Sequence, residues 1–251
     1  MLSYLEIHLV DHCNLNCKGC SHFSPLSPKW FIELDSFEAQ LLQLKKILNT
    51  IGLLRLMGGE PLLHPELRTL INVARSIFPD SRIALVTNGL LLPLLKIEDY
   101  NCFVINGIEV HLTKYPSKKQ KIRKYKRIFK KFKIKNEIVY TNTFYKRFSL
   151  ESSQQTINSF DICQQHKFCP AIKDGRIYQC SGLAYLNTFL QYYKMEPINI
   201  ESYNIFKKEA NYSDLISFIN SANSLCSHCF LNFKPFNWEP TNKHMSEWLI
   251  D

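Results

Sequence analysis

Short apolar, β-branched runs alternate with longer segments that carry apolar residues at helical spacing, from the start of the chain to about residue 140. The short runs predict strands at residues 4–10, 53–57, 82–87, 107–113 and 135–140. The longer segments predict helices at residues 36–50, 65–78 and 117–132. Asp35 or Ser36 is expected to cap the first helix, and Pro65 suits the first turn of the second. This alternation is typical of an α/β fold with a parallel sheet or barrel.

The alternation stops after residue 140. Residues 149–159 are rich in Ser, Gln, Thr and Asn, which is typical of a linker. Farther along, Asp174-Gly175 stands between two short alternating arms and predicts a β-hairpin. We therefore expect a barrel-like domain at residues 1–148, a linker at 149–162 and a second module at 163–251.

The composition indicates a globular protein away from membranes. Of 251 residues, 45% are hydrophobic, enough for one large core or a core with a small appendage. The longest apolar run is far shorter than the roughly 20 residues of a membrane span, and the N-terminus lacks a secretion signal. We expect a cytoplasmic protein with no membrane partner.

The formal charge of +9 is partly local. Residues 118–135 carry many Lys and Arg around apolar residues spaced for one helix face. We interpret this segment as an outer helix whose charged side faces water. A surface that attracts anions, such as a phosphorylated substrate or nucleic acid, is the alternative.

Eight of the nine cysteines fall into groups that are spaced like ligands. Because secretion is not indicated, we expect them to bind metal rather than form disulfides. The groups are Cys13, Cys17 and Cys20; Cys163, Cys169 and Cys180; and Cys226 and Cys229. Cys102 stands alone, and we interpret it as a buried inert thiol.

The first cysteine group directly follows the first predicted strand, in the spacing C-x3-C-x2-C. Active sites of parallel α/β folds form at such carboxyl ends of strands. Three thiolates leave one iron of a 4Fe-4S cluster open for an exchangeable ligand. A structural zinc with His12 or His22 as fourth ligand is the alternative at this site.

The second predicted strand ends in Gly58, Gly59 and Glu60, within the sequence LRLMGGEP. Together with C-x3-C-x2-C, this resembles the radical S-adenosylmethionine (SAM) superfamily. The resemblance implies that this strand end binds SAM, the two glycines letting the backbone approach the ligand closely. It also implies SAM contacts from Thr87 and Asn88 in VTNG. One departure is Gly19, which stands where many relatives carry an aromatic residue near the adenine.

The resemblance further implies a shared start to the reaction. SAM binds the open iron, the reduced cluster cleaves it, and a 5'-deoxyadenosyl radical abstracts hydrogen from substrate. An electron donor such as flavodoxin or ferredoxin is therefore an expected partner.

The later cysteines resemble the auxiliary-cluster modules called SPASM and twitch. The spacing from Cys163 through Gly175 to Cys180 matches their start, and Cys226 and Cys229 close the set as CxxC. The resemblance implies one auxiliary 4Fe-4S cluster, for which five thiols compete for four places. The predicted hairpin sets Cys169 opposite Cys180, which favours Cys169 over Cys163 as the last ligand. A structural zinc on four of these cysteines is the alternative.

Candidate residues for substrate chemistry are His22, His111, Lys114 and Tyr115. A histidine that titrates near neutrality suits proton transfer, although His22 could simply hydrogen-bond its own loop. The segments HFSPL and Tyr115-Pro116 resemble a short radical SAM subfamily associated with surface-polysaccharide genes. We interpret His8 and His64 as structural.

We therefore expect an α/β fold, a partial (β/α)6 TIM-like barrel with a small twitch module. The size is similar to that of a radical SAM aminocyclitol dehydrogenase with one auxiliary cluster. This resemblance implies an oxidoreductase that acts on a small molecule, a sugar, nucleotide sugar or cyclitol, by oxidation, epimerisation or dehydration. Modification of a ribosomally made peptide is the runner-up, and a zinc-bound nucleic-acid-binding module is the remote alternative.

Overall fold

The computed structural model describes residues 2–152, 156–163 and 169–250. An eight-stranded sheet runs through the molecule in the order β5-β4-β3-β2-β1-β7-β8-β9. Its first five strands are parallel: β1 (Leu5–Val10), β2 (Leu53–Gly58), β3 (Arg82–Thr87), β4 (Glu109–Lys114) and β5 (Asn136–Tyr140). All five match predicted strands, and the expected α/β class is confirmed.

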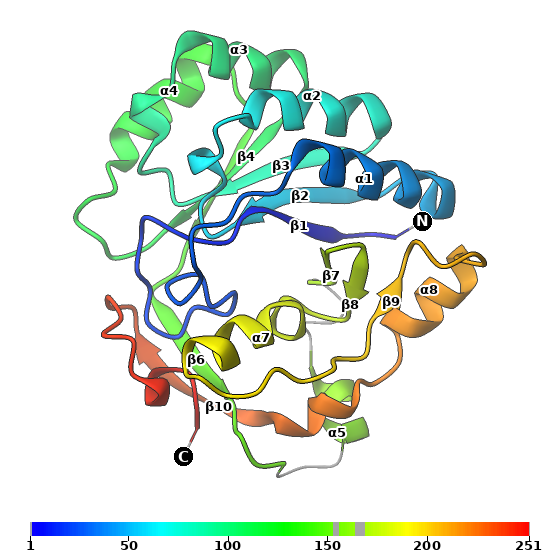
Figure 1. Ribbon diagram of the computed structural model, residues 1–251. Coiled ribbons are helices and arrows are strands. Elements are labelled where there is room, and N and C mark those ends of the chain that lie inside the picture. The colour runs from blue at the N-terminus through cyan, green and yellow to red at the C-terminus, as the bar shows by residue number, and fades with distance from the viewer. Residues whose placement is uncertain (1, 153–155, 164–168, 251) are drawn as a thin grey trace.

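Four helices cover one face of these parallel strands (Figure 1). They are α1 (Leu34–Leu48), α2 (Leu67–Ile77), α3 (Ile97–Ile105) and α4 (Ile122–Phe132). Leu5, Ile7 and Leu9 of β1 belong to the main hydrophobic core. Because side chains alternate along a strand, Glu6 and His8 point to the opposite face. That face carries the chemistry described below.

The helix predictions are correct for α1, α2 and α4 but wrong in two details. Glu33 precedes α1 without a side-chain cap, so the expected cap at Asp35 or Ser36 is not formed. Helix α2 begins at Leu67, after Pro65. In α4, Tyr125 and Phe129 are buried, as the amphipathic pattern predicted. The short helix α3 was not predicted.

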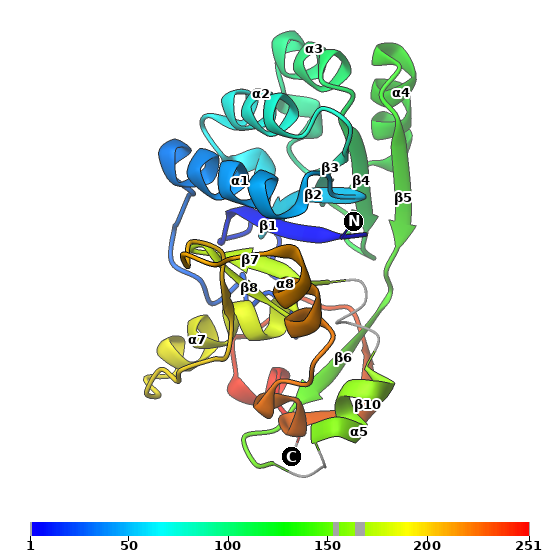
Figure 2. The same ribbon diagram turned by 90° about the vertical axis from the view of Figure 1, so that its right-hand side faces the viewer.

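The second half of the chain joins the same sheet. Strand β7 (Ala171–Lys173) pairs parallel to β1 and antiparallel to β8 (Arg176–Tyr178), and β9 (Tyr203–Asn204) follows at the edge. The predicted turn at Asp174-Gly175 is present, with φ values of 49° and 70°. Strand β6 (Thr143–Phe148) leaves the central sheet and pairs with β10 (Cys229–Asn237) (Figure 2).

Helix α5 (Thr156–Ile162) occupies part of the expected linker, whose residues 153–155 lie outside the described residues, as do residues 164–168. Helix α7 (Ser181–Tyr192) centres a second apolar cluster that includes Phe23, Phe189 and Trp248. Helix α8 (Tyr212–Ile219) and four short 3-10 turns complete the described elements: η1 (Pro61–Leu63), η2 (Leu92–Leu94), η3 (Ser224–His228) and η4 (Met245–Glu247). Among the described residues, none of the helices is long and apolar enough to cross a membrane.

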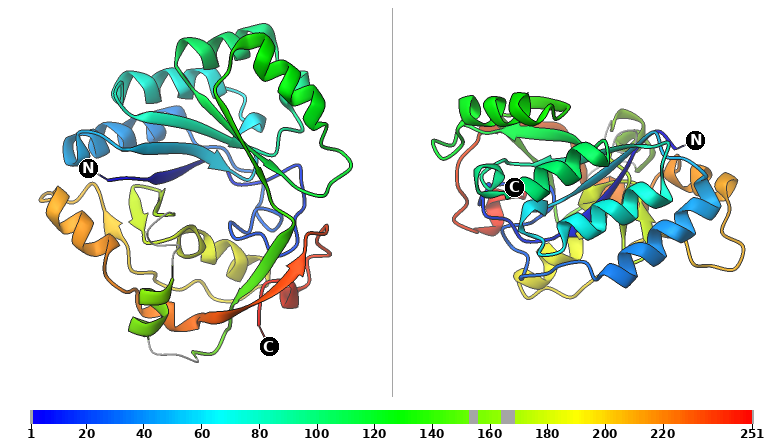
Figure 3. Two further views of the ribbon diagram at one scale, coloured as in Figure 1. Left: turned by 180° about the vertical axis from the view of Figure 1, so that it is seen from behind. Right: turned by 90° about the horizontal axis from the view of Figure 1, so that it is seen from above.

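The segment that follows β1 lies beside the C-terminal end of the chain (Figure 3). We call residues 11–26 the cysteine loop and residues 236–250 the C-terminal arm. The Lys18 amide donates to Glu239 O at 3.0 Å, and the Thr241 amide donates to Asn16 O at 3.1 Å. These backbone bonds fix the loop against a segment more than 200 residues away in sequence.

Candidate active site

A pocket of about 430 Å³ opens at the carboxyl ends of the parallel strands, and we call it the cysteine pocket. Its walls include all three cysteines of the first group and, from later strand ends, Gly58, Gly59, Thr87, Asn88 and Tyr115. The structure therefore brings together residues that the sequence assigned separately to cluster, SAM and substrate.

Two of the three thiols receive N–H donors that suit thiolates. The Leu15 amide lies 3.3 Å from Cys13 Sγ, and Trp238 Nε1 lies 3.1 Å from Cys17 Sγ. Burial raises the pKa of Cys17 to about 12, and the charge of Cys20 adds to it. N–H donors to thiolate sulfur stabilise the charged form and tune a metal centre that the sulfur holds.

The spacing of the thiols suits a cluster. Burial raises the pKa of Cys13, and the charges of Cys20 and Cys17 contribute to the shift, as expected for three sulfurs around one space. All three sulfurs belong to one loop, and their side chains line the same pocket. A 4Fe-4S cluster takes Cys thiolates as ligands, and three of them leave one iron open. The cysteine loop thus suits such a cluster.

The paired glycines make room for the protein's own backbone. A Cβ on Gly58 would lie 2.0 Å from Val10 O, and a Cβ on Gly59 would lie 2.2 Å from His12 O. The Gly59 amide donates to Val10 O at 2.7 Å. The sequence led us to expect that these glycines let the backbone approach a ligand closely. In the structure they let the end of β2 approach the backbone of the cysteine loop.

Glu60 is fully buried and joins the ends of β2 and β3. Its carboxylate accepts from Leu62 N at 3.0 Å, Thr87 Oγ1 at 2.7 Å and Asn88 N at 2.9 Å. Burial raises its pKa to about 7 despite these three donors. Glu60 itself is not among the residues that line the cysteine pocket, so its side chain positions the two strand ends rather than facing the pocket.

A polar cluster of Glu6, His22 and Arg55 also lines the pocket, and of these three residues the sequence pointed only to His22. Glu6 and Arg55 are partners in the β1–β2 register, and Arg55 NH1 lies 3.8 Å from Glu6 Oε1. Both are charged residues inside otherwise apolar strands, which is the signal that could have found them. Tyr4 OH donates to Glu6 Oε1 at 2.6 Å.

His22 connects this cluster to the cysteine loop. Its Nε2 lies 3.5 Å from Glu6 Oε2. Burial alone would lower the pKa of His22, but its hydrogen bonds with Cys20 and Glu6 raise it to about 10. Burial also raises the pKa of Glu6, yet the hydrogen bond and charge of His22 outweigh that effect and hold it below its ordinary value. The pocket therefore places the Glu6 carboxylate beside the His22 imidazole and the Arg55 guanidinium.

Within the described part of the chain, two buried polar atoms of the pocket walls have no hydrogen-bond partner: Ser24 Oγ and Arg55 Nε. Ser24 is only 3% exposed. An unsatisfied buried polar group costs about 1–3 kcal/mol, and such groups in native proteins call for a partner. Both atoms are thus suited to bind a polar ligand.

The other predicted catalytic residues lie in different surroundings. Tyr115 lines the cysteine pocket, and its ring stacks 6.0 Å from that of Trp238. His111 is buried 3.3 Å from Glu109 Oε2 and is not among the residues that line this pocket. Lys114 Nζ bonds the carbonyls of its own loop, at Tyr115 and Ser117. His111 and Lys114 therefore have structural partners, whereas Tyr115 faces the site.

The later cysteines divide into two places. Burial raises the pKa of Cys180 to about 12, with contributions from the charges of Cys163 and Cys226, so these three lie near one another. Cys229 begins β10 beside Phe148 of β6. Cys169, which hairpin geometry favoured as a ligand, instead lines the cysteine pocket near Arg55.

The C-terminal arm also contributes to the site, although no local feature of the sequence predicts it. Trp248 Nε1 donates to Cys20 O at 3.0 Å. A Cβ on Gly19 would lie 2.6 Å from the ring of Phe236. An aromatic ring from the arm thus occupies the space beside Gly19, the position where the sequence lacks an aromatic residue.

The sequence pattern of the family described as the radical SAM superfamily matches residues 7–141. The GTP 3',8-cyclase of Microcystis aeruginosa is 36% identical over 97 residues, and that of Sulfurovum sp. is 34% identical over 93 residues. These matches cover 36% and 37% of this chain but only 29% and 28% of the two relatives. Among solved structures, BtrN in complex with AdoMet and 2-DOIA aligns over 91% of this chain and 93% of its own, with a TM-score of 0.56 and 17% identity. This last likeness is one of fold.

Proposed function

Because the chain belongs to the radical SAM superfamily, and is therefore an enzyme that uses SAM and a 4Fe-4S cluster, we propose that its substrate is a carbohydrate or cyclitol, free or nucleotide-linked. The observation that carries the proposal is the polar cluster that lines the cysteine pocket, where Ser24 Oγ and Arg55 Nε are buried and have no hydrogen-bond partner among the described residues. Hydroxyl groups both donate and accept, so they match a wall of carboxylate, guanidinium and hydroxyl groups. Arg55 also suits the phosphate of a nucleotide sugar.

We propose that Cys13, Cys17 and Cys20 hold the cluster and that the backbone at Gly58–Glu60, Thr87 and Asn88 binds SAM. When bound and reduced, this pair supplies the 5'-deoxyadenosyl radical that abstracts hydrogen from the substrate. The cysteine pocket holds the substrate close to it and restricts water. Tyr115 is proposed to contact the substrate from the pocket wall.

Oxidation of an alcohol carbon is the outcome we favour. Loss of a hydrogen atom from the carbon, followed by loss of the hydroxyl proton and one electron, converts the alcohol to a carbonyl, so the pocket needs a base for the proton. The electron would pass to the auxiliary cluster proposed below. Glu6 lines the pocket, and its pKa is held below the ordinary value, so the carboxylate is ionised at neutral pH and can accept that proton. His22 orients this carboxylate through their contact of 3.5 Å.

We further propose an auxiliary 4Fe-4S cluster on Cys163, Cys180, Cys226 and Cys229, which would supply a second redox centre. The mutual charge effects among Cys163, Cys180 and Cys226 support this choice. Cys169 lines the cysteine pocket, which supports leaving it out of the proposed ligands of the auxiliary cluster. The fold likeness to BtrN, described with AdoMet and 2-DOIA, agrees with a small cyclic substrate.

The test is turnover by anaerobically reconstituted enzyme with SAM, a reductant and panels of nucleotide sugars, aminocyclitols and peptides. We expect a member of the first two panels to raise the rate of 5'-deoxyadenosine formation above the rate without substrate. In Arg55→Ala this stimulation should fall at least tenfold, while substrate-free SAM cleavage continues. Stimulation by peptides alone would contradict the proposal.

A further inference from the structure

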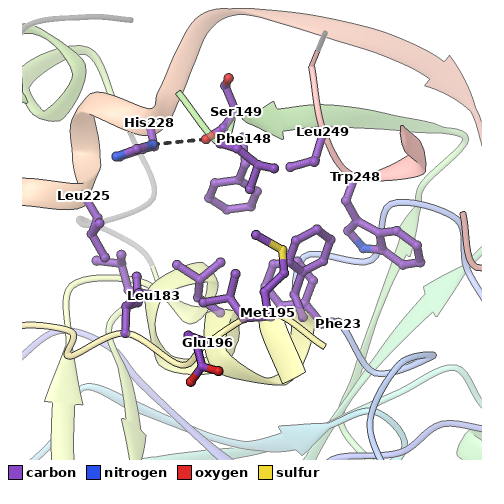
Figure 4. Close-up of a pocket in the computed structure, with 15 residues that line it drawn as sticks. Phe23, Phe148, Ser149, Leu183, Met195, Glu196, Leu225, His228, Trp248 and Leu249 are labelled. Atoms are coloured by element: carbon purple, nitrogen blue, oxygen red, sulfur yellow. Dashed lines mark hydrogen bonds between the residues drawn. The ribbon is translucent and has the colours of Figure 1, made fainter. Parts of the chain in front are cut away.

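A second cavity of about 460 Å³ lies beside the cysteine pocket, between α7, the end of β6 and the C-terminal arm (Figure 4). Its walls are almost entirely apolar, and we call it the apolar cavity. Leu183, Leu186 and Leu190 come from α7, Met195 follows that helix, and Phe148 and Trp248 close the opposite side. Its volume lies within the range of small-molecule sites, about 300–1,000 Å³.

The apolar cavity adjoins the cysteine pocket. Phe148 and Trp248 line both spaces, so the same two aromatic side chains form a shared wall. The Trp248 ring is fixed by the donation of its Nε1 to Cys20 O. Because the two spaces adjoin at these rings, a single ligand that reached into both would have one end at the cysteines and the other among the leucines.

The cavity has little capacity for polar groups. Among the described residues that line it, the polar ones are Ser149, Glu196 and His228, and His228 Nδ1 already lies 3.1 Å from Ser149 O (Figure 4). A peptide brings an N–H and a C=O with every residue, each of which needs a partner when buried. A hydrocarbon chain needs none.

Two apolar side chains among the lining residues are exposed. Leu150 is 48% exposed and Ile198 is 38% exposed. A chain too long for the cavity can therefore continue over apolar surface on leaving it.

We propose that the apolar cavity binds the hydrocarbon chain of an amphipathic substrate whose polar head lies in the cysteine pocket. The polar head rests on the carbohydrate function proposed above. The substrate class is then a lipid-linked sugar or cyclitol rather than a fully water-soluble one.

The test measures binding to the reconstituted enzyme by calorimetry, with butyl, hexyl and octyl β-D-glucosides below their micelle concentrations. A parallel series of butanol, hexanol and octanol tests the cavity without the sugar. Burial of each CH2 should tighten binding by up to about fourfold, so Kd should fall steeply along both series. Leu186→Trp and Met195→Trp fill the cavity and should each flatten this dependence.

Gln191→Trp is the matched control, because Gln191 lies on α7 with its side chain exposed. It should leave the dependence on chain length unchanged. Melting temperature and iron content identify any variant that fails to fold, and the two cavity variants lie on different segments, so one can fail without loss of the test.

The outcomes separate the two proposals. Steep dependence in both series, lost in the cavity variants, supports the cavity as a chain site; if the glucosides then bind no tighter than the alcohols, only the carbohydrate proposal fails. Flat dependence in both series overturns the inference, as does an equal loss in Gln191→Trp. Tighter binding of a capped leucine peptide than of octanol also overturns it.

Discussion

Replacing Gly59 by alanine should separate the end of β2 from the cysteine loop and remove the first cluster. A Cβ at this position would lie 2.2 Å from His12 O and 2.4 Å from His12 C. Both atoms belong to the backbone, so no side chain can turn aside. The contact distance must rise to at least 3.0 Å, which moves the loop that carries Cys13.

The expected cost follows from the contacts that this movement disturbs. Overpacking a closely packed site costs about 1–3 kcal/mol. The bonds from Gly59 N to Val10 O and from Glu60 N to His12 O weaken, at about 1 kcal/mol each. Alanine also reduces the conformational entropy of the unfolded chain, which stabilises the folded state by up to about 1 kcal/mol. We expect a net loss of about 3 kcal/mol in the free energy of unfolding.

The assay is anaerobic urea unfolding followed by circular dichroism, together with iron content and 5'-deoxyadenosine formation. Gly107→Ala is the control, since Gly107 has a φ of 58° but its added Cβ would meet nothing closer than 3.8 Å. That variant should lose only about 1–2 kcal/mol, for its left-handed backbone, and should keep its iron. If Gly59→Ala retains full iron content and SAM cleavage, the argument from close approach is refuted.

Three further predictions test other parts of the site. The first prediction uses a background in which Cys13, Cys17 and Cys20 are all Ala. In this background, Cys163→Ala should lose the remaining iron, whereas Cys169→Ala should keep about four irons per chain. The reverse result would show that Cys169 is the ligand. Glu60→Gln turns an amide NH2 toward the Asn88 N–H, so it should lower the free energy of unfolding by about 2 kcal/mol and weaken SAM binding. The exposed Glu66→Gln should change neither property. Equal melting temperatures and SAM affinities in the two variants would contradict the role of Glu60. Burial lowers the pKa of His8 to about 4, below its value of about 6.5 in the unfolded chain, so the native state loses stability as pH falls through this window. The stability of the wild type relative to His8→Gln should therefore be about 1.5 kcal/mol lower at pH 5.5 than at pH 8 in urea titrations, and a difference independent of pH would argue against a buried neutral His8.

The sequence predicted the parallel strands well because each contains apolar residues, many of them β-branched, in a short stretch between helical segments or turns. The hairpin was equally clear, since Asp174 and Gly175 both adopt the positive φ that a tight turn requires. Helix α3 was missed because nine residues give too little periodicity to separate it from a loop.

The polar cluster was harder to foresee. Glu6 and Arg55 stand out locally as charges in apolar strands, but only the parallel register of β1 and β2 sets them side by side. Trp238 and Trp248 reach Cys17 and Cys20 across more than 200 residues of sequence. No periodicity predicts such contacts.

For Cys169, the hairpin and the pairing of the sheet favour different positions. Hairpin pairing does set residues before β7 opposite residues after β8. However, β7 also pairs with β1, and the Glu6 amide donates to Pro170 O at 2.9 Å. Because of this pairing, Cys169 lies near Glu6 and the cysteine pocket. The geometry of the hairpin alone does not predict this position.

The central claim is that Cys13, Cys17 and Cys20 hold the cluster that cleaves SAM in the cysteine pocket. The most direct measurement is 5'-deoxyadenosine released by reconstituted, reduced protein with SAM and no substrate, compared with the variant in which all three cysteines are Ala. We predict release by the wild type and none by the variant, whose iron content should fall from about eight to about four per chain. Equal release from both proteins, or unchanged iron content, would contradict the assignment.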